Sequence, residues 1–474
     1  MISPVGYILV PIALLLFFRG RRALLWVTVA SIPFQLVQIA DLGITTIKAF
    51  QFFGAFFILR SILDGIWSGD MSFKASAPNV LGGIFILVCF FSLSMAAVKA
   101  GSVEVFGQEG GTWSNVYVSR SPLELSLQNF TQVLYPLWGF LLFYFLVREI
   151  REISDLSKSV NIVVWASVVL AGSSLTGGLL FTFRQGLSYV EFLSLFTVGP
   201  ANITAPDVGS FGQFFRAYTL AGEPGDTAIY YLTSLGLLTG VTAGIHLGST
   251  RGTRFMRAKL LFVVLAILVN GSTAAYFGSA VFVIWCLLLP IYFVRTKTVQ
   301  FGSVSKVILG GTGVLVAAAV LEVSGVSFLE WIQQYHIGKL QGEAGSGQIR
   351  LEVMQHDLEI FLQHPILGVG YGSSLSLSFG TFLISNLGIL GTGLFFAFAF
   401  SVFRRASFVA KQSTSEVGII AFSIALTLPP FMATLLVGMG AFSMNLGITW
   451  LVLAMAEASY QVYKKESTRT QVFA

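Results

Sequence analysis

The chain has 474 residues; 55% of them are hydrophobic, 11% are charged, and the formal net charge is +6. Soluble domains carry roughly 25% charged residues, so this composition excludes an ordinary soluble protein and indicates one that crosses a membrane many times. The sequence has no phosphate-binding loop, no dinucleotide-binding glycine turn and no zinc-ligand spacing, which argues against a nucleotide-driven pump and against a metal or nucleotide cofactor. Nothing in it points to nucleic acid as a partner.

Apolar runs set the fold class. A helix needs about 20 apolar residues to cross a membrane, and thirteen runs approach this length. Their centres are Leu14, Pro33, Phe53, Ile86, Phe140, Val168, Leu235, Leu265, Val283, Leu315, Phe395, Leu426 and Leu451. The sequence therefore predicts an all-α polytopic membrane protein with about 13 transmembrane helices and short interfacial helices in the outer loops.

The basic residues predict the orientation. No basic residue precedes the first run, whereas Arg19, Arg21 and Arg22 follow it. If this side is cytoplasmic, alternate loops hold most of the 28 lysines and arginines, as the positive-inside rule requires. An odd number of spans then places the N-terminus outside and the C-terminus in the cytoplasm. Three long loops lie on the outer side, and the cytoplasmic loops are short.

The third outer loop ends in a polar segment that predicts a helix, SGQIRLEVMQHDLEIFLQ. Its apolar residues recur at three- and four-residue steps, and Ser346 is placed to cap a helix that starts near Gly347. Arg350 and Asp357 lie seven residues apart and therefore on one side of this helix. The helix is expected to lie at the membrane interface and to frame a cavity. Alternatively it only seals the bundle, and Arg350 reaches lipid headgroups.

The segment HPILGVGYGSS follows directly. Pro365 is expected to end the helix, and the glycines Gly368, Gly370 and Gly372 allow a tight turn back into the membrane. His364 is either a catalytic group, because an unperturbed histidine titrates near 6.5, or a residue that hydrogen-bonds at the helix end.

The second outer loop contains FRAYTLAGEPGDTAIY, just before the seventh apolar run. The residues EPGD are typical of a turn that is followed by the start of a helix. The segment is either a solvated turn or a site where Arg216 clamps a phosphate through two hydrogen bonds. Glu223 lies seven residues after Arg216, where partial burial would raise its pKa and make it a base. Asp226 is the third charged residue of this segment, after Arg216 and Glu223.

These segments resemble the O-antigen ligase and polysaccharide polymerase family. The resemblance rests on the helix that carries Arg350, on the His-Pro turn, and on GTFLISNLGILGTGLFF with its Gly-apolar-apolar-Gly step from Gly388 to Gly391. RAYTLAGEPGD and NGSTAAYFGSAVFV are similar to the family's earlier arginine loop and to its Ser/Thr-rich span. Order and spacing match from about Phe215 to Phe400.

The resemblance implies an integral-membrane glycosyltransferase of the bacterial inner membrane that uses no metal or nucleotide sugar. Its donor would be an oligosaccharide on undecaprenyl diphosphate, and its acceptor either another carrier-linked repeat or lipid A core. The family's outer arginines correspond to Arg216 and Arg350, which would hold the diphosphate with Asp226 and Asp357 nearby. A flippase and a chain-length regulator would be partners, with membrane lipid around the chain.

The family's ligases carry a His-Asn pair about ten residues before the glycine step, whereas this chain reads LSLSFG at 375–380. This difference favours a polymerase for exopolysaccharide, capsule or O-antigen over a ligase. Glu223 is then the first candidate for the base and His364 the second. A flippase for the same lipid is the other alternative, but charges midway along the spans are scarce. The chain divides into an N-terminal bundle (1–182), a family core (183–403) and C-terminal helices (404–474).

Overall fold

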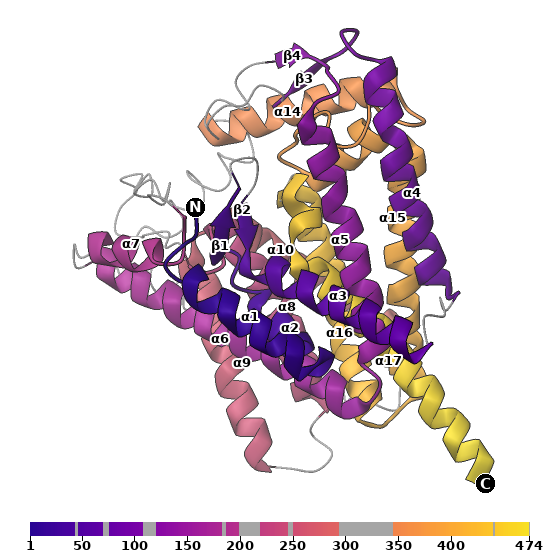
Figure 1. The fold of residues 1–474 in the computed structure, drawn as a ribbon. Helices are drawn as coiled ribbons and strands as arrows, with labels where there is room; N and C mark the ends of the chain where they lie inside the picture. The colour runs from indigo at the N-terminus through magenta and orange to yellow at the C-terminus, as the bar shows by residue number, and fades with distance from the viewer. Residues whose placement is uncertain are drawn as a thin grey trace.

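The computed structural model describes residues 1–42, 46–69, 75–107, 120–182, 186–198, 219–244, 250–292, 345–438 and 441–473. These ranges are almost entirely helical (Figure 1). Six helices are long and apolar enough to cross a membrane: α3 (Ala49–Ser68), α4 (Ala77–Val98), α5 (Leu127–Glu149), α6 (Ile153–Thr182), α15 (Phe379–Gln412) and α16 (Glu416–Gly438). The all-α membrane class is thereby confirmed, whereas the count of thirteen spans is not.

The other helices within the described ranges are shorter, less apolar or both. They are α1 (Gly6–Arg19), α2 (Arg21–Ser31), α7 (Gly186–Ser194), α8 (Pro224–Gly244), α9 (Thr250–Asn270), α10 (Thr273–Tyr292), α14 (Gly345–Gln363), α17 (Gly447–Phe473) and the 3-10 helix η3 (Ala441–Asn445). Two antiparallel hairpins pair β1 (Gln38–Asp41) with β2 (Thr46–Lys48) and β3 (Glu104–Phe106) with β4 (Arg120–Pro122). The sequence did not predict these strands.

The first two predicted spans form a short helical hairpin instead. Helix α1 has 14 residues and α2 has 11, and the single residue Gly20 joins them. Both are shorter than the roughly 20 residues of a spanning helix. Helix α2 ends at Ser31, two residues before Pro33, and proline has no backbone N–H with which to continue the helix. The predicted span centred on Pro33 is therefore wrong, and the run centred on Leu315 lies outside the described residues.

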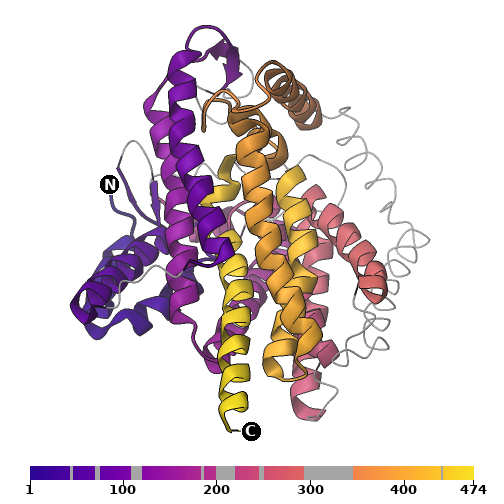
Figure 2. The ribbon, with the colours of Figure 1, turned by 90° about the vertical axis from the view of Figure 1, so that its right-hand side faces the viewer.

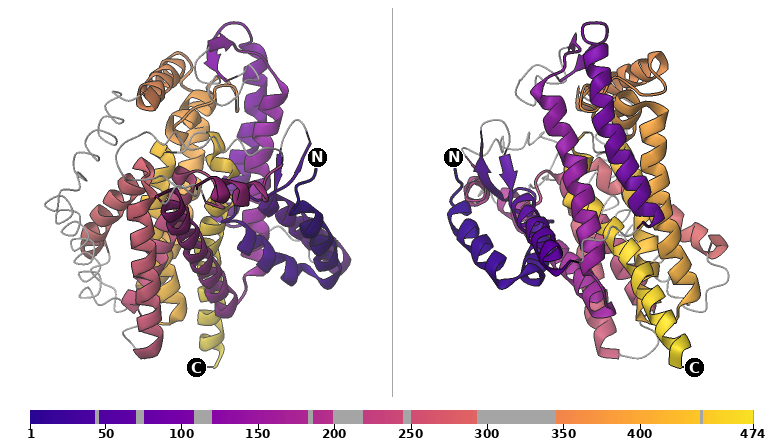
Figure 3. Two further views of the ribbon diagram at one scale, coloured as in Figure 1. Left: turned by 90° about the vertical axis from the view of Figure 1, so that its left-hand side faces the viewer. Right: turned by 45° about the vertical axis from the view of Figure 1, so that its right-hand side comes forward.

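The longest helices pack side by side. Helix α16 contacts α8, α10, α15 and α17, and α15 contacts α4 along much of its length. Figures 2 and 3 show α14 and the β3–β4 hairpin together at one end of this bundle, with the C-terminus at the other. We call the end with α14 the outer end, following the predicted orientation.

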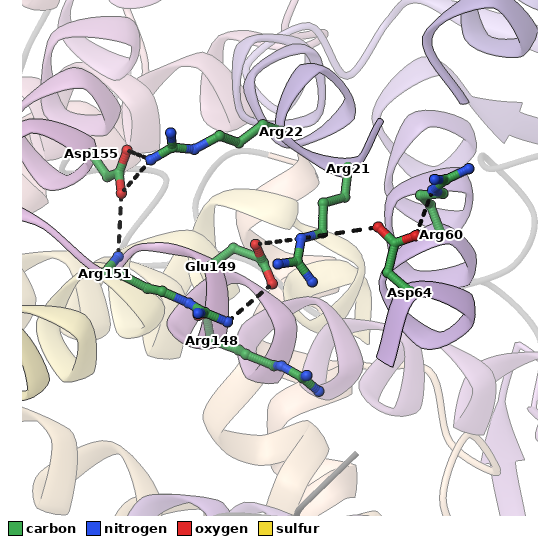
Figure 4. A network of polar contacts seen from close by, with 8 residues as sticks. All are labelled: Arg21, Arg22, Arg60, Asp64, Arg148, Glu149, Arg151 and Asp155. Carbon is green, nitrogen blue, oxygen red and sulfur yellow. Dashed lines mark hydrogen bonds and ion pairs between the residues drawn. The ribbon is translucent and has the colours of Figure 1, made fainter. Parts of the chain in front are cut away.

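An ion-pair network ties four helices together at the opposite end, which we call the basic end (Figure 4). Arg21 of α2 contacts Glu149 of α5 at 3.1 Å. Arg22 contacts Asp155 of α6 at 3.1 Å. Arg60 and Asp64, one turn apart on α3, pair at 2.9 Å, and Arg21 also approaches Asp64 at 4.0 Å. These contacts fix the α1–α2 hairpin against the bundle.

Candidate active site

The outer end is organised around a break in α15. Gly388 has φ 59° and ψ −162°, so the helix is interrupted there. The turn after α14 occupies the break. Two amides beyond it, of Ile389 and Leu390, donate to Pro365 and Ile366, while the carbonyls of Ser385 and Asn386 accept from Val369 and Gly370. The backbone groups that the break leaves unpaired are thus satisfied by the His-Pro turn.

The glycines of this turn behave as the sequence predicts. Gly368, Gly370 and Gly372 all have positive φ, at 63°, 107° and 77°. At Gly368 a side chain would also overlap the backbone of Asn386. The turn therefore lies directly against α15. The helix before it is confirmed as well, although it begins at Gly345. Ser346 accordingly lies in its first turn.

Two buried asparagines hold the chain after the turn. The side-chain oxygen of Asn386 accepts from the amides of Ser373 (2.9 Å) and Ser374 (3.0 Å), and its nitrogen donates to the Ser374 carbonyl (2.9 Å). Asn129 of α5 donates to the Tyr371 carbonyl (3.2 Å) and to the Ser373 hydroxyl (2.9 Å). Both asparagines are fully buried, so each contact avoids an unpaired polar group in an apolar interior.

Asp357 is buried beneath this segment, with no exposed surface. Its Oδ1 accepts from the Ser374 hydroxyl at 3.1 Å. Burial raises the pKa of Asp357 to about 6, and the hydroxyls of Ser376 and Thr381 oppose the rise. A carboxyl enclosed in this way anchors α14 to the start of α15. In this arrangement the Asp357 side chain does not reach the protein surface, where a ligand would bind.

Arg350 lies on the same helix and is partly buried. Its Nη1 donates to the Leu377 carbonyl at 3.3 Å. The segment from Ser374 to Leu377 thus runs along α14, from Asp357 back to Arg350. The sequence predicted that both charges lie on one side of the helix, and both side chains contact the segment from Ser374 to Leu377. They differ in burial, because only the arginine retains exposed surface.

The β3–β4 hairpin covers the other side of α14. His356 Nε2 lies 2.8 Å from the Glu104 carbonyl, and its ring packs edge-on against Phe106. Arg120 forms a 3.5 Å ion pair with Glu352. The first outer loop and the third therefore form one outer structure, a contact between segments more than 200 residues apart in sequence.

His364 follows the last residue of α14. Its Nε2 is buried and has no hydrogen-bond partner. Burial and the nearby charge of Lys99 lower the pKa of this histidine, while Lys99 itself donates to the Gly368 carbonyl at 2.8 Å. A neutral imidazole is able to accept a proton. However, Arg350 is roughly 20 Å away along the helix. The two side chains are therefore too far apart to contact the same small part of a ligand.

The turn before α8 forms a second outer cluster. The Thr219 and Thr227 hydroxyls lie 2.7 Å apart, and Thr219 and Gly222 exchange backbone hydrogen bonds at 3.0 and 2.9 Å. Glu223 is exposed, in contrast to the expected partial burial. Asp226 is the more buried carboxyl: burial, together with the Glu223 charge, raises its pKa to about 7.

Lys48 faces this carboxyl from the end of β2. Burial lowers the pKa of Lys48, and the charge of Asp226 opposes that shift. Its Nζ donates to Gln35 at 3.2 Å, and Gln35 in turn donates to the Tyr230 hydroxyl at 2.9 Å. The sequence did not single out Lys48 as a site residue. Its only signal was a basic residue on the predicted outer side, where such residues are few.

The structure brings together only part of the predicted site. Arg350 and Asp357 share the α14 cluster, and Glu223 and Asp226 share the α8 cluster. Arg216 lies outside the described residues, so its expected approach to Arg350 stays a prediction. Across the described ranges, no group of three or more His, Cys, Asp or Glu side chains is arranged to hold a metal ion.

The fold defines a polytopic helical membrane protein. Two clusters of polar side chains, most of them partly or fully buried, lie at its outer end. A family model described as O-antigen ligase matches residues 258–386. The matched segment runs from α9 to Asn386 and includes Arg350, His364 and the turn that fills the break in α15. The resemblance to the O-antigen ligase and polymerase family is confirmed over this segment, and it supports a membrane enzyme that acts on lipid-linked polysaccharide. A search of curated proteins finds no match.

Proposed function

We propose that the protein is a glycosyltransferase that polymerises undecaprenyl-diphosphate-linked oligosaccharide repeats on the outer face of a bacterial inner membrane. The observation that carries the proposal is the match to the O-antigen ligase model over the segment with Arg350 and the His-Pro turn. The absence of a His-Asn pair at 375–380 favours polymerase over ligase. A flippase and a chain-length regulator are the partners that such a polymerase requires.

In the proposed reaction, a hydroxyl of the acceptor sugar attacks the anomeric carbon of the donor. A new glycosidic C–O bond forms, the bond from that carbon to the diphosphate oxygen breaks, and the carrier diphosphate leaves. Its negative charge needs stabilisation, which guanidinium groups provide through charge-assisted hydrogen bonds. Arg350, partly exposed on α14, supplies one such group, and Arg216 supplies the second.

The hydroxyl proton goes to the carboxylates at the start of α8. A base with a pKa near the working pH is the most effective, and Asp226 has a pKa of about 7. Glu223, three residues earlier and exposed, then contacts the sugar. His364 is the alternative base. Because Arg350 is roughly 20 Å distant, this alternative requires both the acceptor hydroxyl and the donor diphosphate to bind at the far end of α14, away from Arg350.

The test is chain extension by purified protein in liposomes. With the lipid-linked repeat alone, the proposal expects products of several repeats. With lipid A core also present, a ligase would transfer the repeats to that acceptor and a polymerase would not. Asp226→Asn and Glu223→Gln should each slow extension without abolishing binding of the carrier lipid. If both extend at the wild-type rate while His364→Ala is inactive, the base is the histidine.

The orientation is part of the proposal. A membrane-impermeant thiol reagent applied from outside should modify Ser346→Cys, at the start of α14, and should leave Thr253→Cys, in the first turn of α9, unmodified. Labelling of the second variant alone would reverse the orientation and place the proposed site on the wrong face.

A further inference from the structure

A groove at the basic end lies apart from the proposed site. It has a volume of about 680 Å³ and follows one face of α6, from Ser154 to Val169, between α2 and the first turn of α16. It begins next to Asp155, one of the carboxylates in the network of Figure 4. Nothing in the proposed reaction uses this end of the molecule.

The lining changes from polar to apolar along α6. The polar part comes first and consists of Ser154, Ser157, Lys158 and Asn161. Apolar side chains follow, from Ile162 to Val169. This apolar part covers roughly 11 Å of helix at 1.5 Å per residue, which fits within one leaflet, about half of a 30 Å hydrocarbon core. The groove therefore suits a lipid whose headgroup lies at the basic end.

The charges around the polar part favour a particular headgroup. The Lys158 ammonium stands 4.2 Å from the centre of the Trp26 ring, which holds it at the groove. Glu416, in the first turn of α16, lines the same groove. Neither charge forms an ion pair with another described residue. A headgroup that carries both signs complements them, whereas a purely anionic headgroup is repelled by Glu416.

A second cavity begins at the same polar edge. Its volume is about 250 Å³, and it shares Ser157, Asn161 and Glu416 with the groove. It continues between α6, α8, α9 and α16 over apolar side chains such as Leu238 and Ile420. Two apolar spaces that diverge from one polar edge match a lipid with two acyl chains.

We propose that this groove binds a diacyl phospholipid with a zwitterionic, primary-amine headgroup. Its phosphate contacts Lys158 and its ammonium contacts Glu416. One chain follows α6, and part of the other enters the smaller cavity. Ligand pockets of this size are commonly apolar with a few polar groups that fix orientation, and basic residues at membrane surfaces attract lipid phosphates.

The test is lipid binding to the purified, delipidated full-length protein, measured by native mass spectrometry. Phosphatidylethanolamine is titrated against phosphatidylglycerol and phosphatidylcholine. We expect preferential binding of phosphatidylethanolamine. Glu416→Gln should weaken its binding about fivefold, as expected for a partly screened charge pair, and should remove its advantage over phosphatidylglycerol. Lys158→Met should weaken all three lipids, while Lys464→Met, an exposed lysine of α17, should change none.

A volume variant tests the site without altering charge. Val169 is half-exposed at the apolar end of the groove, so Val169→Trp is expected to fold and to reduce the binding of all three lipids. Equal affinity of the wild-type protein for phosphatidylethanolamine and phosphatidylglycerol would overturn the proposal. So would equal loss of binding in Lys158→Met and Lys464→Met, because binding would then be a property of the whole surface.

Discussion

At the scale of single residues, Asp357 gives the clearest dependence on pH. Its side chain is fully buried and its pKa is raised from 3.8 to about 6. The native state therefore binds this proton more tightly than the unfolded chain does. The stability that Asp357 contributes falls as the pH rises from about 4 to about 6, and it stays constant above that range.

Replacement of Asp357 by asparagine should remove this dependence. The amide oxygen can still accept from Ser374, and no charge has to be buried. Near neutral pH we expect Asp357→Asn to be more stable than the wild-type protein by up to about 3 kcal/mol, and near pH 4 by much less. Unfolding in detergent at both pH values measures this. A stability difference that does not change with pH would contradict the assignment.

Single residues were predicted from the sequence only where a local motif surrounded them. Arg350 stood out because it lies in an amphipathic helix before a glycine turn. Asn129 and Asn386 did not, since their partners are in other segments: Asn129 contacts residues more than 240 positions away. Lys48 was missed for the same reason. For the two asparagines, the available signal in the sequence was a polar amide within a segment rich in apolar residues.

At the scale of elements, the break in α15 and the His-Pro turn form one unit. A Cβ at Gly388 would overlap the backbone of Ile366 and Leu367, and the residue has φ 59°. Gly388→Ala should therefore destabilise the protein by more than the roughly 1–2 kcal/mol of a left-handed non-glycine residue. It should also displace the turn and lower chain extension.

Gly393, in the same helix, is the matched control. A Cβ there would meet no atom within 4 Å, so Gly393→Ala should be neutral or stabilising, by at most about 1 kcal/mol. Thermal unfolding of both variants measures the difference. If the two have the same melting temperature, the turn does not depend on the break in α15.

Elements with a strong local pattern were predicted best. Helix α14 and its turn follow from periodicity, proline and glycine. The α1–α2 hairpin does not, because hydropathy alone cannot distinguish a short buried helix from half of a span. The Gly388–Gly391 step was visible in the sequence. Its role is to leave backbone groups of α15 free to hydrogen-bond with residues 365–370. That role depends on tertiary contacts, which the sequence pattern does not reveal.

At the scale of the whole molecule, the network at the basic end holds the N-terminal helices to the bundle. The Glu149 side chain is only 6% exposed, and its nearest cation is Arg21 at 3.1 Å. Arg21→Met should cost roughly 1.5–3 kcal/mol of stability, because it removes the nearest partner of a buried carboxylate and leaves Arg151 at 3.9 Å.

The double variant Arg21→Met/Glu149→Gln should recover much of this loss, since no buried charge then remains unpaired. Melting temperatures of the two single variants and the double variant form the measurement. Simple addition of the two single effects would show that the pair is not coupled in the folded protein.

The central claim is that the outer end binds the diphosphate of the donor, and Arg350 tests it most directly. The measurement is the rate of chain extension from a purified lipid-linked repeat, at matched protein level and melting temperature. Arg350→Ala should be roughly ten- to a hundredfold slower, the loss of one charge-assisted contact of about 1.5–3 kcal/mol. Arg350→Lys should recover only part of the rate, because an ammonium lacks the two-pronged geometry.

Arg120→Ala is the control, because that arginine lies at the same end but pairs with Glu352 over the β3–β4 hairpin. It should extend chains at nearly the wild-type rate. If Arg350→Ala also extends at the wild-type rate, the guanidinium does not hold the diphosphate, and α14 only seals the outer end of the bundle.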